Sequence, residues 1–192
     1  MKIYDLSPEI SEKMVVYKNK PRNKPKIKVI RTIKKGDIAN ESVFVLYAHT
    51  GSHVDAPYHF LNEGITIEKL SLDKFMGKAI VLDLTKIKNG IKKSHLENSK
   101  LKIQKNTIVL LKTKNKSDKT YNYNFTFLEK TGSVYLVSKK VKAVGLDSLS
   151  IERSQPDYDT HKILLINKIP IFEGFLNIKK GDASPIRAIL IK

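Results

Sequence analysis

The sequence predicts a strand-rich α/β protein with a few helices, and three observations support this class. Short apolar runs rich in β-branched residues recur along the chain, as they do in strands. Patterns with helical spacing are fewer and shorter, so strands should outnumber helices by roughly two to one. A chain of 192 residues that is 41% hydrophobic can bury a core of its own. We therefore expect a single domain over residues 1–192.

The apolar runs divide the chain into nine expected strands. Each run is short, and most are bounded by lysines or by turn-forming residues, which is typical of strands rather than of long helices. In chain order the expected strands are 2–6, 14–17, 27–33, 42–47, 79–84, 107–111, 141–146, 169–172 and 186–191.

About four helices are expected, and three of them have recognisable starts. Ser7-Pro8-Glu9 is typical of an N-cap followed by proline at the first helical position. The stretch 132–140 carries apolar residues at helical spacing, and the stretch 161–167 follows the polar pair Asp159-Thr160.

Lysine-rich connectors occupy 18–28, 86–105 and 112–119. None is long enough, or sufficiently rich in glycine and serine, to mark a domain boundary, and no internal repeat is present. One domain with basic loops is therefore the simplest interpretation.

The formal charge is +17, from 36 Lys+Arg against 19 Asp+Glu, and such an excess raises the hypothesis of a nucleic-acid partner. The lysines are spread over nearly every loop, however, and aromatic residues make up only 8% of the chain. Nucleic-acid-binding proteins usually gather basic and aromatic residues in one stripe. We expect a solvated basic surface and no nucleic-acid partner.

The chain contains no cysteine, so any metal must be held by His, Asp or Glu. No stretch approaches the ~18 uninterrupted apolar residues of a membrane span, and the first ten residues lack the apolar core of a signal peptide. The expectation is a cytoplasmic protein with no membrane association.

Three of the five histidines fall within the eleven residues 49–59, HTGSHVDAPYH. His49, His53, Asp55 and His59 all occupy odd positions, so an extended backbone would direct them to one face. No lysine or arginine occurs between Tyr47 and Gly64, although lysine is frequent elsewhere. Neutral imidazoles beside a carboxylate and away from competing cations predict a metal site.

A fully extended segment 49–59 would span roughly 33 Å at about 3.3 Å per residue, too far for one metal, so the chain must bend. Gly51 and Pro57 are the expected bending points. His53 and Asp55, one residue apart, can share a metal directly. A helical pair of His49 and His53 is disfavoured, because the intervening Thr-Gly-Ser is poor helix material.

The segment 49–59 resembles the H-x-G-[TS]-H-x-D-x-P-x-H signature of the metal-dependent cyclase family, whose members include bacterial kynurenine formamidases. The family places a further His and Glu twelve residues apart near the C-terminus, and His161 and Glu173 stand at that separation. The segment 144–151, VGLDSLSI, resembles the family's Gly-hydrophobic-Asp segment. A carboxylate directly after the apolar run 169–172 also needs a cation or strong donors, which favours a metal at Glu173.

Carried over by position, the resemblance implies that His49, His53 and Asp55 hold one metal. It implies that Asp55 also reaches a second metal held by His161 and Glu173. His59 would donate and accept the proton. The ligand set suits one or two Zn²⁺ per chain and permits Mn²⁺.

For the fold, the resemblance implies a mixed, barrel-like sheet of the swivelling β/β/α type. For assembly it implies a homodimer or homotetramer, and the early segment 17–28 could serve as an arm that packs on a neighbour.

For function, the resemblance implies a metal-dependent amidohydrolase acting on a small-molecule amide, by metal-activated water. The first candidate is an arylformamidase of tryptophan catabolism, which converts N-formyl-L-kynurenine to L-kynurenine and formate. The family often has an aromatic residue followed by Pro-Gly-Asp in an early substrate-facing loop. Here Tyr17 and Pro21 are present, but Pro-Gly-Asp is missing and lysines replace it. Tyr17 is the expected substrate-binding residue.

Three alternatives stay open at this stage. One is a related hydrolase acting on another aryl or cyclic amide, such as an isatin-like lactam. The second is a metal-binding protein without hydrolytic activity, and the third is a basic nucleic-acid-binding protein.

Overall fold

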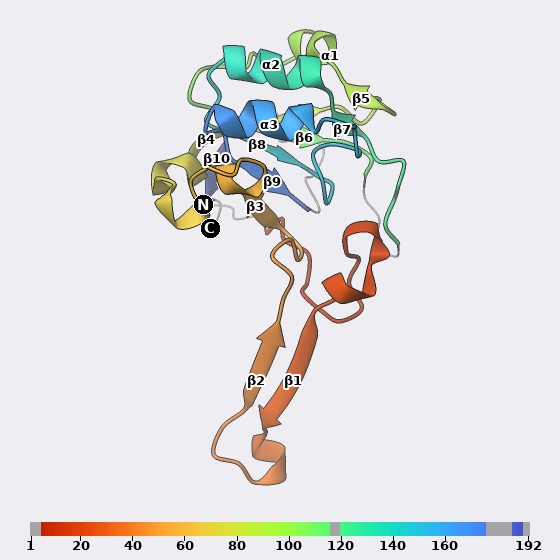
Figure 1. The fold of residues 1–192 in the computed structure, drawn as a ribbon, viewed down its shortest axis with the longest axis vertical. Helices are drawn as coiled ribbons and strands as arrows, with labels where there is room; N and C mark the ends of the chain where they lie inside the picture. The colour runs from red at the N-terminus through yellow and green to blue at the C-terminus, as the bar shows by residue number, and fades with distance from the viewer. Residues whose placement is uncertain (1–4, 116–119, 176–185, 190–192) are drawn as a thin grey trace.

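The computed structural model describes residues 5–115, 120–175 and 186–189. A mixed central sheet carries three α-helices on one face, and a two-stranded hairpin projects away from this body (Figure 1). A mixed α/β class with few helices, as the sequence predicts, is confirmed.

The strands of the central sheet are β10 (Ile186–Ile189), β4 (Met76–Asp83), β6 (Ile108–Lys112), β8 (Ala143–Leu146), β9 (Ile171–Glu173) and β3 (His53–Asp55), in spatial order. The four inner strands run parallel, whereas β10 pairs antiparallel with β4, and β3 pairs antiparallel with β9. Among the described strands, β10 and β3 stay unpaired with each other, so the sheet is open rather than closed by a ring of hydrogen bonds.

Three α-helices and two small sheets complete the regular structure of the described residues. The α-helices are α1 (Lys93–Glu97), α2 (Lys130–Ser138) and α3 (Asp159–Ile166). The small sheets pair β1 (Lys26–Arg31) with β2 (Glu41–Val45), and β5 (Gly90–Ile91) with β7 (Phe127–Leu128). Single 3₁₀ turns are η1 (Tyr17–Asn19), η2 (Pro21–Asn23), η3 (Ile33–Lys35), η4 (Pro57–His59), η5 (Ile67–Lys69) and η6 (Leu72–Phe75).

Both faces of the sheet are buried, which explains why its parallel strands are continuous apolar runs. On β6, Val109 and Leu111 pack with the helices in one cluster, whereas Ile108 and Leu110 belong to a second cluster on the opposite face. The same alternation holds on the neighbouring strands, because successive side chains of a strand point to opposite faces. Leu164 of α3 covers the first face and so brings α3 against β9.

Six of the nine expected strands are confirmed within a few residues, namely those expected at 27–33, 42–47, 79–84, 107–111, 141–146 and 169–172. The strand expected at 186–191 is present at 186–189, and its last two residues lie outside the described part. The strand expected at 14–17 is wrong, because Met14–Val16 is irregular and Tyr17 begins η1. The strand expected at 2–6 lies mostly outside the described residues, and Asp5 and Leu6 are not in a strand.

The helices expected at 132–140 and 161–167 are confirmed as α2 and α3, each beginning two residues earlier. The helix expected to begin at Ser7 does not form. There the Asp5 carboxylate accepts a hydrogen bond from the Ser7 backbone N–H, a local turn that competes with a helical start. The connector 86–105, expected to be irregular, contains β5 and α1.

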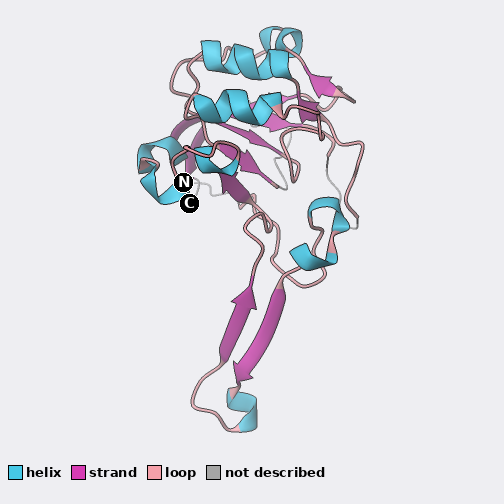
Figure 2. Cartoon of the chain, in the orientation of Figure 1, coloured by secondary structure: helices cyan, strands magenta, loops and turns pink. Residues whose placement is uncertain are grey.

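The projecting hairpin is formed by β1 and β2, and we call residues 26–47 the arm (Figure 2). The sequence placed an arm at 17–28, whereas the projecting segment begins at residue 26. Most of residues 17–25 form η1 and η2 instead. In the part of the chain that the structure describes, none of the helices is long and apolar enough to cross a membrane.

Candidate metal centre

Two antiparallel edge strands place the first functional side chains opposite each other. In the β3–β9 pair, His53 lies opposite Glu173 and Asp55 lies opposite Ile171. Residues directly opposite in a pair, and residues two apart in a strand, share a face of the sheet. His53, Asp55 and Glu173 therefore point to the same side, where α3 presents His161 from its first turn.

The chain bends on both sides of β3, as the segment 49–59 requires. Gly51 has a φ of +64°, a left-handed conformation that glycine adopts without strain, and Pro57 begins the 3₁₀ turn η4. The turn before β3 brings His49 back beside Asp55, and η4 brings His59 against His49, with ring centroids 4.4 Å apart. Both expected bending points are confirmed.

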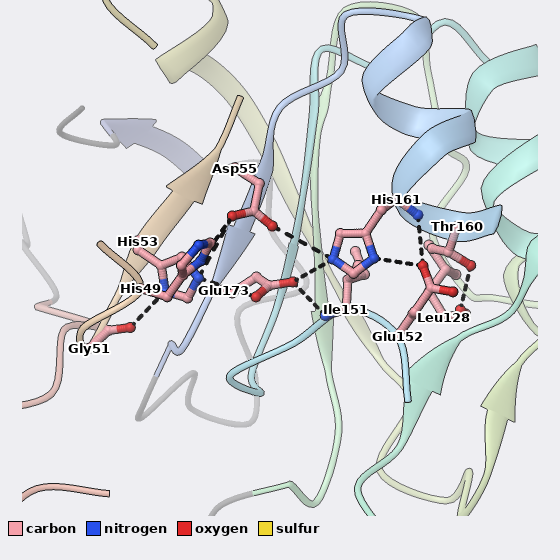
Figure 3. Close-up of polar contacts among 10 residues, drawn as sticks. All are labelled: His49, Gly51, His53, Asp55, Leu128, Ile151, Glu152, Thr160, His161 and Glu173. Carbon is pink, nitrogen blue, oxygen red and sulfur yellow. Dashed lines mark hydrogen bonds and ion pairs between the residues drawn. The ribbon is translucent and has the colours of Figure 1, made fainter. Parts of the chain in front are cut away.

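Asp55 is the centre of the cluster (Figure 3). Its Oδ1 lies 3.3 Å from Nδ1 of His49 and 3.8 Å from Nε2 of His53, and its Oδ2 lies 3.6 Å from Nε2 of His161. Glu173 contacts the same rings, with Oε2 3.2 Å from Nε2 of His53 and Oε1 3.6 Å from Nε2 of His161. The structure thus brings all five sequence-predicted metal ligands together.

The polar atoms of this cluster are arranged for a cation. Asp55 is 2% exposed, yet neither of its carboxylate oxygens accepts a hydrogen bond, and Nε2 of His53 is likewise buried without a hydrogen-bond partner. Buried polar atoms without partners are costly unless an ion satisfies them. Two groups have ligand atoms close enough to share an ion: His49 with Asp55 and His59, and His53 with Asp55 and Glu173. The donor set therefore fits a divalent metal.

The carboxylates also change the protonation of the buried histidines in the metal-free chain. Burial disfavours the charged form of His161, but hydrogen bonds to Glu152 and Glu173 outweigh it and raise the His161 pKa to about 9. Burial opposes the charge of His53 in the same way, yet Glu173 raises its pKa above the ordinary value. His161 is therefore protonated at neutral pH, and a bound metal must displace that proton.

His59 differs from these rings. It is more exposed than the other histidines of the cluster, and desolvation lowers its pKa below the ordinary value, with Asp55 partly opposing the shift. His59 is thus a neutral imidazole at neutral pH, able to accept a proton. Its ring packs edge-on against Phe60, with the centroids 4.6 Å apart.

Two contacts around the ligands were not predicted from the sequence. The buried Glu152 accepts hydrogen bonds from His161, and the Ile151 backbone N–H donates to Oε1 of Glu173 at 2.5 Å. Glu152 follows Leu149-Ser150-Ile151 and precedes Arg153, so it lacks the apolar run that singles out Glu173. The partner of Glu152, His161, is nine residues further on, so only the fold reveals the contact.

A cavity of about 420 Å³ lies beside the two glycines next to the ligand strands, Gly51 and Gly174. Aromatic rings of Tyr121 and Phe125 contribute to its wall. Tyr17, expected to bind substrate, packs edge-on against Tyr121 with ring centroids 5.3 Å apart. No contact of Tyr17 with the ligand cluster is seen among the described residues, and its role stays a prediction.

Gly174 allows the two ligand-bearing segments to approach closely. Its φ is +77°, and a Cβ at this position would lie 2.4 Å from the Gly51 carbonyl oxygen. Any larger residue would therefore push apart the turn before β3 and the end of β9, which carry His53 and Glu173.

This cluster, at the edge of a mixed sheet and beside a helix start, defines a metal-dependent hydrolase. A solved structure described as a potential metal-dependent hydrolase with cyclase activity matches with a TM-score of 0.84 and 35% identity, over 94% of this chain and 85% of that one. The chain belongs to the cyclase family, because the family profile described as "Putative cyclase" matches residues 4–153.

Curated relatives agree with this placement. Cyclase-like protein 1 of Arabidopsis thaliana is 28% identical, over all of this chain and 85% of its own length. A protein named kynurenine formamidase from Delftia acidovorans (strain DSM 14801 / SPH-1) is 25% identical over 83% of each chain. A crystal structure of an isatin hydrolase has a TM-score of 0.78 at 19% identity over 94% of this chain and 81% of that one, a likeness of fold.

Proposed function

We propose that this protein is an arylformamidase that hydrolyses N-formyl-L-kynurenine to L-kynurenine and formate. The observation that carries the proposal is the convergence of three imidazoles on the unpartnered carboxylate of Asp55, with the neutral ring of His59 directly beside them. The relatives named kynurenine formamidase support the choice of an aryl formamide over other amides.

His49, His53, Asp55, His161 and Glu173 would hold one or two divalent cations. Zn²⁺ suits these imidazole and carboxylate ligands, and Mn²⁺ is compatible with them. The bound cation supplies Lewis-acid activation of water and of the amide carbonyl. Asp55 belongs to both groups of candidate ligands, the one with His49 and the one with His53 and Glu173, and can bind a cation in either.

His59 would move the proton. An imidazole nitrogen of His59 accepts the proton of the attacking water and then donates it to the leaving amine, so that the C–N bond breaks as the free arylamine forms. The lowered pKa of His59 keeps its ring in the accepting state at neutral pH. The neighbouring Phe60 limits the positions that the ring can adopt.

The aromatic cavity offers space for an aryl ring beside the cluster's strands, although none of its lining residues is a predicted metal ligand or His59. A volume of about 420 Å³ is within the range of pockets for small organic ligands. Tyr121 and Phe125 line this cavity, and Tyr17 packs on Tyr121, so an aniline ring would find aromatic partners close to Gly51 and Gly174.

A hydrolysis screen tests the proposal. Protein loaded with Zn²⁺ or Mn²⁺ is assayed against N-formyl-L-kynurenine, isatin and simple formanilides, and the release of arylamine or opening of the lactam is followed. We expect the highest kcat/KM with N-formyl-L-kynurenine. Faster turnover of isatin would contradict the substrate, and no turnover by the metal-loaded chain would contradict an amidohydrolase.

We also propose that the protein is a homodimer joined through the arm. Eight apolar residues of the arm are 43–62% exposed, namely Val29, Ile30, Ile33, Val43, Phe44, Val45, Leu46 and Tyr47, and Ile38 in the connection between β1 and β2 is fully exposed. Val29 and Phe44 share one face of the hairpin, and Val43 and Val45 share the other. A two-stranded hairpin is marginally stable alone, and a membrane surface would cover one face only. A second copy of the chain can enclose both faces, as apolar patches of this kind usually require.

Phe44→Glu should convert the dimer to a monomer, because the charge would have to be buried in the interface. Light scattering coupled to gel filtration measures the mass at tens of micromolar protein. Val134→Glu is the matched control, since Val134 is 51% exposed on α2, away from the arm, and should leave the mass unchanged. A monomeric wild-type chain, or a Phe44→Glu chain that keeps the dimer mass, would contradict the arm interface.

A further inference from the structure

Glu152 is a buried carboxylate outside the ligand set. It is 1% exposed. Its Oε2 accepts a hydrogen bond from the backbone N–H of His161 at 2.9 Å and lies 2.6 Å from Nδ1 of the same residue's ring. The backbone N–H can only donate, so Oε2 acts as an acceptor. An ionised carboxylate can only accept hydrogen bonds, so opposite it the proton of the ring lies on Nδ1.

This contact decides which nitrogen of His161 faces the cluster. With the proton on Nδ1, the Nε2 atom is the one available to a cation, and it lies 3.6 Å from both Asp55 Oδ2 and Glu173 Oε1. Figure 3 shows the ring of His161 held between Glu152 on one side and the two ligand carboxylates on the other. Phe60 stacks on the same ring, with centroids 4.3 Å apart and an interplanar angle of 24°, and this stacking limits rotation.

Glu152 forms an ion pair with His161. Within the described part of the chain, no second cationic side chain pairs with Glu152. The adjacent Arg153 is directed elsewhere, with its guanidinium 4.8 Å from the ring centroid of Phe127. The second oxygen of Glu152 is buried without a hydrogen-bond partner. Keeping a carboxylate in such surroundings costs stability, so a role in folding alone is a poor account of it.

The residue before Glu152 serves the neighbouring ligand. The Ile151 backbone N–H donates to Oε1 of Glu173 at 2.5 Å, so two consecutive residues after β8 orient Glu173 and His161. The backbone at this point is itself anchored, because the Ile151 carbonyl accepts a hydrogen bond from the Leu128 N–H at 2.8 Å. Ligand histidines commonly donate their second N–H to a carboxylate, which orients the ring and raises its basicity.

We propose that Glu152 is a positioning residue that fixes the tautomer and orientation of His161, and so strengthens the binding of a divalent cation by the cluster. The proposal rests on the proposed metal site, but not on the identity of the substrate.

The test measures metal affinity rather than turnover. Zn²⁺ binding to the full chain is measured by competition with a chelating dye, and the visible spectrum of the Co²⁺-loaded chain reports on its ligands. Glu152→Ala should weaken Zn²⁺ binding by roughly 10–100-fold. Glu152→Gln should weaken it by about 10-fold, because the amide oxygen can still accept both hydrogen bonds but lacks the charge. Both variants should change the Co²⁺ spectrum.

Asp147→Asn is the matched control. Asp147 is also a largely buried carboxylate after β8, and it accepts hydrogen bonds from the backbone N–H and the hydroxyl of Thr113, both at 2.6 Å, without touching a ligand. This variant should keep Zn²⁺ affinity within twofold of the wild type.

The outcomes separate this proposal from the proposed function. Circular dichroism shows whether the Glu152→Gln chain folds. If it folds and binds Zn²⁺ within twofold of the wild type, the proposed role of Glu152 is overturned, even if Glu152→Ala fails to fold. A wild-type chain that binds no Zn²⁺ overturns it together with the metal site. A wild-type chain that binds Zn²⁺ and loses affinity on Glu152→Gln supports it, whichever amide the screen identifies.

Discussion

His59→Ala is expected to lower kcat for N-formyl-L-kynurenine by about 10²–10⁴-fold, the usual contribution of a general acid–base group, while the chain keeps its metal. The imidazole of His59 lies 4.4 Å, between ring centroids, from that of His49, and partial desolvation by its neighbours lowers its pKa, which favours the neutral ring at pH 7. The five other residues of the cluster hold their contacts with one another without it. Steady-state kinetics and metal analysis of the same samples make the measurement.

His95→Ala is the control, because His95 lies in α1, where it accepts a hydrogen bond from the Lys92 N–H. It should leave both kcat and metal content unchanged. His59 is also close enough to His49 and Asp55 to share an ion with them. A His59→Ala chain that loses a full metal equivalent would therefore make His59 a ligand, and wild-type turnover would remove it from the mechanism.

Asp55→Asn is expected to remove both metal binding and activity. Asp55 is the residue that contacts His49, His53 and His161, and an amide has neither the charge nor the two acceptor oxygens of a carboxylate. Zn²⁺ at 1,000 times its Kd should stabilise the wild type by about 4 kcal/mol. The variant should show almost none of that gain.

Thermal unfolding with and without Zn²⁺ measures this difference, and Asp147→Asn is again the matched buried carboxylate. The control should keep the Zn²⁺-dependent rise in Tm, even if its own Tm is lower. A similar rise in Tm for the Asp55→Asn chain would show that the cation binds elsewhere, and the assignment of the cluster would fail.

Much of the fold could be predicted because its central strands are buried on both faces. A strand such as β6, buried throughout apart from Lys112, is a continuous apolar run that stands out against lysine-rich loops. The small elements were missed for the opposite reason. β5 has two residues and α1 has five, which is too short for either periodicity to be recognised, and lysines flank both.

Two errors came from local signals that the rest of the molecule overrode. Met14–Val16 has the composition of a strand, but it has no strand partner in the described structure, and Val16 is buried against the body instead. Ser7-Pro8 has the composition of a helix start, but the Asp5 carboxylate binds the N–H of Ser7 first. Composition alone could not show whether these residues would form regular structure or pack and hydrogen-bond in another way.

The candidate metal ligands could be chosen from the amino-acid sequence without a structure. The ligands in 49–59 lie within eleven residues of one another, so a bend at Gly51 and Pro57 is enough to gather them, and the resemblance placed His161 and Glu173. How His49, His53 and Asp55 meet His161 and Glu173 depends on the three-dimensional fold. The register of β3 on β9 sets His53 opposite Glu173, and the packing of α3 places His161 between those ligands and Glu152. Contacts across 120 residues depend on strand order and register, which residue spacing does not encode.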